Sequence, residues 1–361
     1  MLRHVVMVNP KSIGLQYGML RDLEDEIVRL TGAQIALVPR IDLPGFVYSR
    51  IGFGLPLARL RVLVRGASWP IRGDVLWVVL MGPEDSDLDL LRGWSEGFGT
   101  KILYLYDTFE YQLPVLRKLV SLTRWDVAVT SFNDAVPILE RETGIRWHCV
   151  PQGVLSSRFQ PVVGARPIPF SAYGRREPRV HKAALAWARR AGLHYDFTVS
   201  NSVDPSLDPR DTYEHYAWHL RNSVFSFSWP VELTNPSRAG SLHPITCRWF
   251  EAASTGTVIV GRAPDNPAML DYFGPDLVVP LNPDTDEAAI GRRMDELWEQ
   301  RSEHLRAAER RAARRDTWTW ETRVREMLRI ARLPVPLGER RLSAPERSPS
   351  PWCEPPSPVS S

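Results

Sequence analysis

The chain has 361 residues, 43% of them hydrophobic, and a formal net charge of only +3 at pH 7. This length is long for a single hydrophobic core and favours two domains of ordinary size. The small net charge gives no support to a nucleic-acid partner. Only four of the 45 basic residues are lysine. This arginine excess is compatible with phosphate recognition, but we attribute it to a GC-rich coding sequence, as the Ala, Pro and Gly content also indicates.

The cysteines and the apolar runs indicate in which cellular compartment the protein is expected. Cys149, Cys247 and Cys353 form no CxxC pair and no zinc spacing, and an odd number of thiols indicates a reducing compartment. The longest apolar run, residues 75–81, is far shorter than the roughly 20 residues that a membrane span needs. With no signal peptide evident, we expect a cytoplasmic protein with at most a weak peripheral membrane contact.

Strand-like runs recur in the first half of the chain, and helical stretches lie between most of them. This alternation predicts a parallel sheet covered on both faces by helices. The loop over residues 9–18 contains glycines but lacks the GxGxxG pattern, which makes a dehydrogenase a weak interpretation. The expected strands lie at residues 4–9, 34–38, 60–64, 75–81, 102–106, 127–130 and 147–150.

An acidic run at residues 84–89 contains two Asp-x-Asp triplets, formed by Asp85, Asp87 and Asp89. Such triplets bind metals in some proteins. Here the apolar residues Leu88, Leu91 and Trp94 predict a helix, and acids at its start would stabilise its positive end. We therefore predict no metal ligand.

Two acids follow the strand at residues 102–106. Ligands of open α/β sheets bind beyond the carboxyl ends of the strands, so Asp107 and Glu110 are candidates for ligand contacts or for a general base. The alternative is that Asp107 caps the next helix, which carries Leu113 and Leu116. The sequence leaves both open.

Composition divides the rest of the chain. Prolines and a glycine in residues 161–169 indicate a hinge, so we expect a first domain at 1–160 and a second at 161–333. Residues 334–361 include eight prolines among 28 residues, which predicts a disordered tail. A helix predicted at 287–315 ends in a basic stretch, 301–315, interpreted as solvated surface, with membrane contact as the alternative.

The second half predicts further strands and a basic turn. After the first strand, Gly174 leads through Arg175 and Arg179 into a helix at residues 183–191. Guanidinium groups and helix amides at a strand-to-helix turn favour phosphate, so both arginines are candidates for a diphosphate clamp, against a solvated alternative. The strands are expected at 168–173, 195–199, 224–227, 257–260 and 276–280.

The stretch 243–261 reads as a short helix feeding a buried strand, with Pro244 at the first helical position and Gly256 ending the helix. Arg248 and Glu251 are three residues apart, hence on one face. Their alternative role is a surface ion pair worth about 0.2–0.5 kcal/mol. The polar loop at 229–242 precedes this helix.

The segment Arg248-x-Phe250-Glu251-Ala252-x-x-x-Gly256 resembles the donor-site helix of GT-B glycosyltransferases, especially the spore-maturation-protein-like branch and more distantly the retaining family-four type. The resemblance implies an α/β fold of two Rossmann-like domains whose parallel sheets face each other across a cleft. It also implies that Glu251 binds the ribose of a nucleotide sugar. The family-four type has a second Glu eight residues earlier, where this chain has His243.

The resemblance implies transfer of a sugar from a nucleotide-sugar donor to an unidentified acceptor, which could be a glycan, a lipid or a small molecule, without metal or cofactor. A nucleotide-sugar 2-epimerase and a non-catalytic nucleotide-sugar-binding module are the alternatives. The nucleotide, the sugar, the stereochemical outcome and the oligomeric state stay open. The implied catalytic residues are Asp107 and His243, the donor contacts are Arg175, Arg179, Gly240, Ser241, Arg248 and Glu251, and the acceptor contacts are Gly14, Tyr17 and Glu110.

Overall fold

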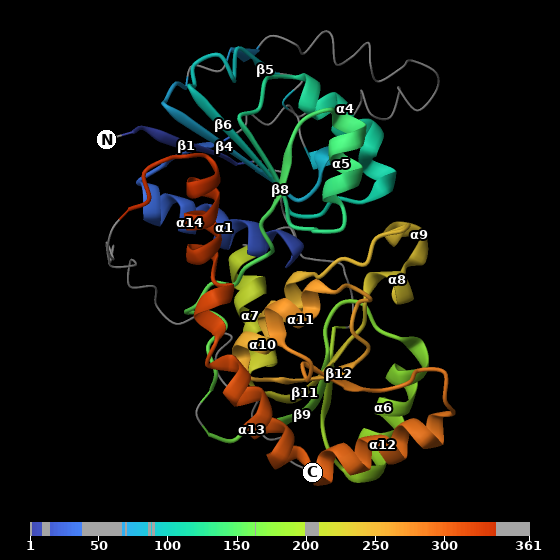
Figure 1. The fold of residues 1–361 in the computed structure, drawn as a ribbon. Helices are drawn as coiled ribbons and strands as arrows, with labels where there is room; N and C mark the ends of the chain where they lie inside the picture. The colour runs from blue at the N-terminus through green and yellow to red at the C-terminus, as the bar shows by residue number, and fades with distance from the viewer. Residues whose placement is uncertain are drawn as a thin grey trace, which may run out of the picture.

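The structure is a computed structural model that describes residues 2–8, 15–37, 67–68, 71–85, 88, 91–162, 164–198 and 209–336. Each half of the chain forms a parallel sheet with helices on both faces (Figure 1). The predicted strand at 60–64, Gly14 and residues 337–361 lie outside the described residues.

Within the described residues, the first sheet contains six parallel strands, and the strands at residues 4–8 and 75–80 are buried throughout. Strands covered on both faces read as continuous apolar runs, which is why these elements are visible in the sequence. Helices α4 (Leu113–Ser121) and α5 (Val136–Thr143) pack on one face and α1 (Leu15–Thr31) on the other. In spatial order the strands are β2 (Gln34–Leu37), β1 (His4–Val8), β4 (Val75–Leu80), β6 (Thr100–Leu105), β7 (Val127–Thr130) and β8 (Trp147–Cys149).

The second sheet has five parallel strands. One face carries α6 (Pro178–Ala191), α12 (Glu287–Glu299) and α13 (Arg301–Ala312), and the other carries α7 (Pro209–Arg221), α10 (Cys247–Thr255) and α11 (Ala268–Phe273). In spatial order the strands are β10 (Tyr195–Phe197), β9 (Ile168–Ala172), β11 (Ser223–Ser228), β12 (Val258–Gly261) and β13 (Val278–Pro280). Shorter elements are β3 (Ala67–Ser68) paired with β5 (Leu91–Arg92), the 3-10 helices η1 (Pro83–Asp85), η3 (Glu110–Gln112) and η4 (Arg315–Trp318), and α8 (Val231–Thr234) and α9 (Pro236–Ala239).

The last helix, α14 (Trp320–Ile330), returns to the first sheet and lies beside α1 (Figure 1). Its residues Trp320, Val324 and Met327 are buried in the same apolar cluster as Val6 of β1. Residues 320–330 therefore belong structurally with the first sheet, although they follow the second sheet in the sequence. Within the described residues, no helix has both the length and the apolar character to cross a membrane.

A buried ion pair joins the two halves of the chain between helices α1 and α7. Arg158 donates through Nε and Nη2 to the two carboxylate oxygens of Asp22 in α1, at 3.0 and 2.9 Å, and through Nη1 to Glu214 of α7 at 2.9 Å. Arg210 donates to Asp25 at 2.9 and 2.8 Å. Bidentate pairs of this kind fix orientation as well as distance, so they hold α1 against α7.

Three predicted helices differ from the observed ones. Leu91 and Arg92 form strand β5 instead of continuing a helix from residue 88, because they pair with β3. The helix predicted at 287–315 is two helices separated at Gln300. The helix predicted from Pro244 begins only at Cys247 and ends, as expected, at Gly256, which has a φ of 68°.

Candidate active site

The carboxyl ends of the two sheets face each other, because the loops that follow their strands are in contact. Asp107 follows β6 and accepts a hydrogen bond of 2.9 Å from Nη2 of Arg238, in α9 after β11. Asn133 follows β7 and exchanges two amide hydrogen bonds, of 3.1 and 2.9 Å, with Asn266 after β12. This is the edge at which ligands of parallel α/β sheets bind.

Arg175 and Arg248 lie close to each other on the side of the second sheet. Arg175 follows β9, and the charges of both Asp107 and Arg248 act on it. The turn at Gly174 has a φ of 72°, and a Cβ there would lie 1.9 Å from Nη2 of Arg248. Glycine is therefore required both for the backbone conformation and for the close approach of the Arg248 guanidinium.

These three arginines carry N–H groups that the protein does not satisfy. Nε of Arg175, Nε of Arg238 and Nη1 of Arg248 are buried without a hydrogen-bond partner. Burial, and then the neighbouring charge of Arg248, lower the pKa of Arg175 to about 9. Arg175 is thus subject to the charges of two other arginines, Arg238 and Arg248, as well as that of Asp107. Such a group of donors suits an anion with several oxygen atoms, such as a diphosphate.

The Asp107 carboxyl lies in this positive environment and is largely covered, with 19% of its side chain exposed. Burial raises the pKa of Asp107 above its ordinary value, and Arg238 and Arg175 offset only part of that effect. Asp107 does not cap α4, which begins at Leu113 directly after Gln112. The alternative of a capping role is therefore wrong, and Asp107 remains available as a titratable group at the site.

The predicted donor residues Gly240 and Ser241 contact the predicted acceptor residue Glu110. The Ser241 hydroxyl donates to Oε1 of Glu110. A Cβ on Gly240, whose φ is 62°, would lie 2.7 Å from Oε2 of the same carboxylate. The loop at 229–242 is thus folded onto the first domain, where Val231, Ala239 and Leu242 join the apolar cluster of the first sheet.

The sequence places Arg238 in the polar loop at 229–242, but it does not indicate a role for Arg238 that differs from that of its neighbours. Its guanidinium carbon lies 4.6 Å from the centre of the Phe109 ring, against which the ring of Tyr111 stacks at 6.1 Å. Tyr111 is 55% exposed. An exposed aromatic ring next to Asp107 and Glu110 adds an apolar surface to the acceptor side.

Glu251 lies deeper than the sequence suggests. It is 1% exposed, and its two oxygens accept hydrogen bonds from the hydroxyl groups of Tyr213 and Tyr216, the latter at 2.7 Å. Burial raises the pKa of Glu251, while the two tyrosines and Arg248 oppose this shift. Glu251 and Arg248 form no surface ion pair. For Glu251 to contact a ribose, the hydroxyl groups of Tyr213 and Tyr216 would have to move away from the carboxylate.

His243 and Arg179 lie apart from the arginine group. The His243 amide donates to Asp134 at 2.6 Å, and its Nδ1 lies 3.2 Å from Oε1 of Glu232. Arg179 points into solvent with its nearest carboxylate, Asp284, at 3.8 Å. Both side chains are accessible, at 42% and 61% of their surface.

The remaining predicted residues lie on the first domain. Tyr17 is in the first turn of α1 and packs against the apolar cluster beneath it, while Gly14 is outside the described residues. Asp85 ends η1, and Asp87 and Asp89 are not described. Within the described part of the chain, no group of three or more His, Cys, Asp or Glu side chains is placed to hold a metal ion.

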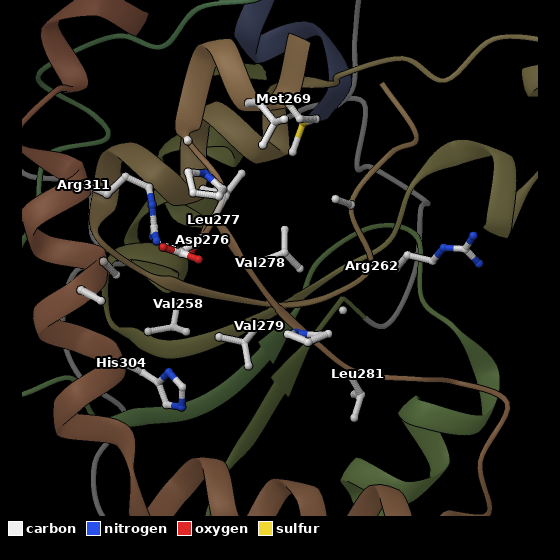
Figure 2. A pocket seen from close by; sticks show the side chains of 18 of the residues that line it. Val258, Arg262, Met269, Asp276, Leu277, Val278, Val279, Leu281, His304 and Arg311 are labelled. Carbon is white, nitrogen blue, oxygen red and sulfur yellow. Dashed lines mark hydrogen bonds between the residues drawn. The ribbon is translucent and has the colours of Figure 1, made fainter. Parts of the chain in front are cut away.

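A separate cavity of about 920 Å³ runs along β13, at the edge of the second sheet (Figure 2). Its walls are mainly apolar, with Arg311 and His304 of α13 at one side. None of the predicted site residues lines it. The buried residues Ala308 and Ala312 of α13 face the sheet, so the apolar side of this basic helix is used inside the domain. Its contact with a membrane stays a prediction.

Comparison with known structures identifies the architecture. No protein-family model matches the sequence, and neither does any curated protein. The structure of sucrose-phosphate synthase from Thermosynechococcus elongatus is similar over 92% of this chain and 98% of that one, with a TM-score of 0.56 and 12% identity. The chain has the GT-B fold.

A second solved structure is also similar to this chain over most of its length. UDP-GlcNAc 2-epimerase from Neisseria meningitidis, bound to UDP-GlcNAc, matches over 91% of this chain and 99% of that one, with a TM-score of 0.50 and 8% identity. A glycosyltransferase from Rickettsia africae matches with a TM-score of 0.49, 9% identity and coverage of 91% and 97%. At these low identities, the similarities with TM-scores of 0.56 and 0.50 show the fold alone. The prediction of two facing parallel-sheet domains is confirmed.

Proposed function

We propose that the protein is a glycosyltransferase that takes its sugar from a nucleotide-sugar donor. The observation that carries this proposal is the group of Arg175, Arg238 and Arg248, each with a buried N–H that has no partner. Arg238 is bonded to Asp107, and the charges of Arg238, Arg248 and Asp107 all act on Arg175. The group lies at the carboxyl edges of two facing sheets. The fold as a whole is similar to that of the UDP-GlcNAc 2-epimerase.

In the proposed reaction the arginines stabilise the leaving diphosphate. The acceptor oxygen bonds the anomeric carbon while the bond from that carbon to the diphosphate oxygen breaks. Positive groups already fixed around the developing charge lower the barrier without reorganisation. The donor diphosphate would also take over the hydrogen bond that Arg238 makes to Asp107. Asp107 would then accept the proton of the acceptor hydroxyl, which suits a carboxyl whose pKa burial has raised.

The structure supports the other predicted donor and acceptor contacts to different extents. Gly240, Ser241 and Glu110 lie together where donor and acceptor would meet. His243 and Arg179 have accessible side chains but lie apart from the arginine group. We propose that Glu251 supports the site by holding α10 against α7 through Tyr213 and Tyr216, with direct ribose contact as the alternative.

A 2-epimerase is the second candidate, because the fold of the UDP-GlcNAc 2-epimerase matches this chain at a TM-score of 0.50. A non-catalytic nucleotide-sugar-binding module is the third. All three would bind the donor, so only the products separate them.

The test has two stages. A thermal-shift screen of UDP-, GDP-, ADP- and dTDP-sugars first identifies the donor, since a ligand that binds the folded state raises its apparent stability. The stabilising donor is then incubated with the protein and a panel of sugar, lipid and small-molecule acceptors. Release of nucleoside diphosphate with a glycosylated product supports a transferase. A 2-epimer of the donor sugar identifies the second candidate, and an unchanged donor the third. No stabilisation by any nucleotide sugar contradicts the proposal.

A further inference from the structure

Two histidines on α7 face each other one helical turn apart, away from the arginine group. The Nε2 atoms of His215 and His219 are 3.0 Å apart, and the ring centres are separated by 4.3 Å. Residues four apart lie on the same face of a helix, so α7 itself holds the two rings together. His215 is exposed to solvent, while His219 is largely covered.

The orientation of His219 is set by a carboxylate on the neighbouring strand. Nδ1 of His219 contacts Oδ2 of Asp196, which also accepts a hydrogen bond of 2.5 Å from the Tyr173 hydroxyl. With the Asp196 carboxylate accepting at Nδ1, the Nδ1–H tautomer of His219 leaves the lone pair of Nε2 directed at His215.

We propose that His215 and His219 bind a divalent transition-metal cation, typified by Zn²⁺, through their two Nε2 atoms. Imidazole nitrogen is a preferred ligand of Zn²⁺, Cu²⁺ and Ni²⁺. With metal–nitrogen distances of 2.0–2.1 Å, two ligands of a tetrahedral Zn²⁺ ion lie about 3.3 Å apart, so the pair needs to open by only a few tenths of an ångström.

The second shell of this site is already in place. A metal-bound histidine generally donates its other ring N–H to a carboxylate, which fixes the tautomer and raises the basicity of the ligand. Asp196, held in turn by Tyr173, supplies that carboxylate. Since the described residues hold no group of three metal-binding side chains, water would complete the coordination at the exposed His215 side. This inference does not depend on the proposed transferase activity.

The test is calorimetric titration of the untagged full-length protein with ZnCl₂, compared with four variants. We expect one Zn²⁺ per chain in the wild type and loss of that binding in both His215→Gln and His219→Gln. Asp196→Asn keeps both ligands but loses the second-shell acceptor, so its affinity should fall about 10–100-fold. His148→Gln, a histidine in the first domain, is the matched control and should bind as the wild type does.

A spectroscopic readout separates coordination from a change in folding. Electron paramagnetic resonance of the wild type with one equivalent of Cu²⁺ should show coupling to two imidazole nitrogens, and His215→Gln should show one fewer. Thermal melting confirms that each variant is folded. Absence of Zn²⁺ binding at millimolar concentration, or equal binding by wild type and His215→Gln, would leave the pair as a hydrogen bond only and overturn the proposal.

Discussion

Replacing Arg248 by alanine should weaken nucleotide binding without weakening the fold. Nη1 of Arg248 is buried without a partner, and the Arg248 charge lowers the pKa of Arg175. Holding two like charges close together costs stability in the absence of an anion, because each disfavours the charged form of the other. The melting temperature of nucleotide-free Arg248→Ala should therefore equal or exceed that of the wild type.

The expected loss of affinity follows from the hydrogen bonds that the guanidinium would make to a diphosphate. A hydrogen bond to a charged group contributes about 1.5–3 kcal/mol. At about 1.4 kcal/mol for each factor of ten, the dissociation constant should rise at least about tenfold and up to about 150-fold. Higher salt should reduce this difference where the group is open to solvent.

The assay is calorimetric titration of the wild type, Arg248→Ala and Arg189→Ala with UDP, GDP, ADP and dTDP, alongside thermal melting without nucleotide. Arg189 is an exposed arginine of α6 and serves as the matched control, for which neither affinity nor stability should change. A lower melting temperature for Arg248→Ala with unchanged affinity would show that Arg248 only supports the fold. That outcome would refute the diphosphate assignment.

Four further predictions concern Asp107, the buried ion pair and metal dependence. Asp107→Asn should lower turnover by about 10²–10⁴-fold, the usual contribution of a general base, with nucleotide affinity unchanged or higher. In the wild type, activity should fall as the pH is lowered through the raised pKa of Asp107, because the protonated carboxyl cannot accept a proton; a flat acidic limb would exclude this role. Asp22→Ala should lower the free energy of unfolding, measured by urea denaturation, by less than the about 3–5 kcal/mol expected for an unpaired buried charge, because Arg158 loses its bidentate partner but keeps Glu214. Transfer should persist in EDTA, with loss that Mn²⁺ restores as the contradicting result.

The fold was predictable because its determinants are local and repeated. The continuous apolar runs at 75–81 and 102–106 could only be strands covered on both faces, and they are β4 and β6 of the first sheet. Gly256 marked the end of α10 because a left-handed residue is cheapest for glycine. The prediction of a helix after residue 88 was wrong, because Leu91 and Arg92 pair with β3 despite the helical spacing of the apolar residues.

The candidate site residues were predicted on two grounds and stay predictions. Asp107 and Arg175 follow predicted strands, where ligands of α/β sheets bind, whereas Arg248 was named from the resemblance to the donor-site helix. Arg238 carried no such signal, since its contact with Asp107 depends on the loop at 229–242 folding onto the other domain. The pair His215 and His219 has helical spacing, but only Asp196, on another strand, gives it an orientation.

The sequence by itself determined which segments are strands and helices, and that the chain forms two α/β domains, because hydrophobic periodicity and capping residues act within a few neighbouring positions. Tertiary structure decided which side chains meet. The return of α14 to the first sheet, the burial of Glu251 beneath Tyr213 and Tyr216, and the meeting of Arg238 with Asp107 join residues distant in the chain. Such contacts depend on how the two sheets pack face to face, a geometry that no local pattern encodes.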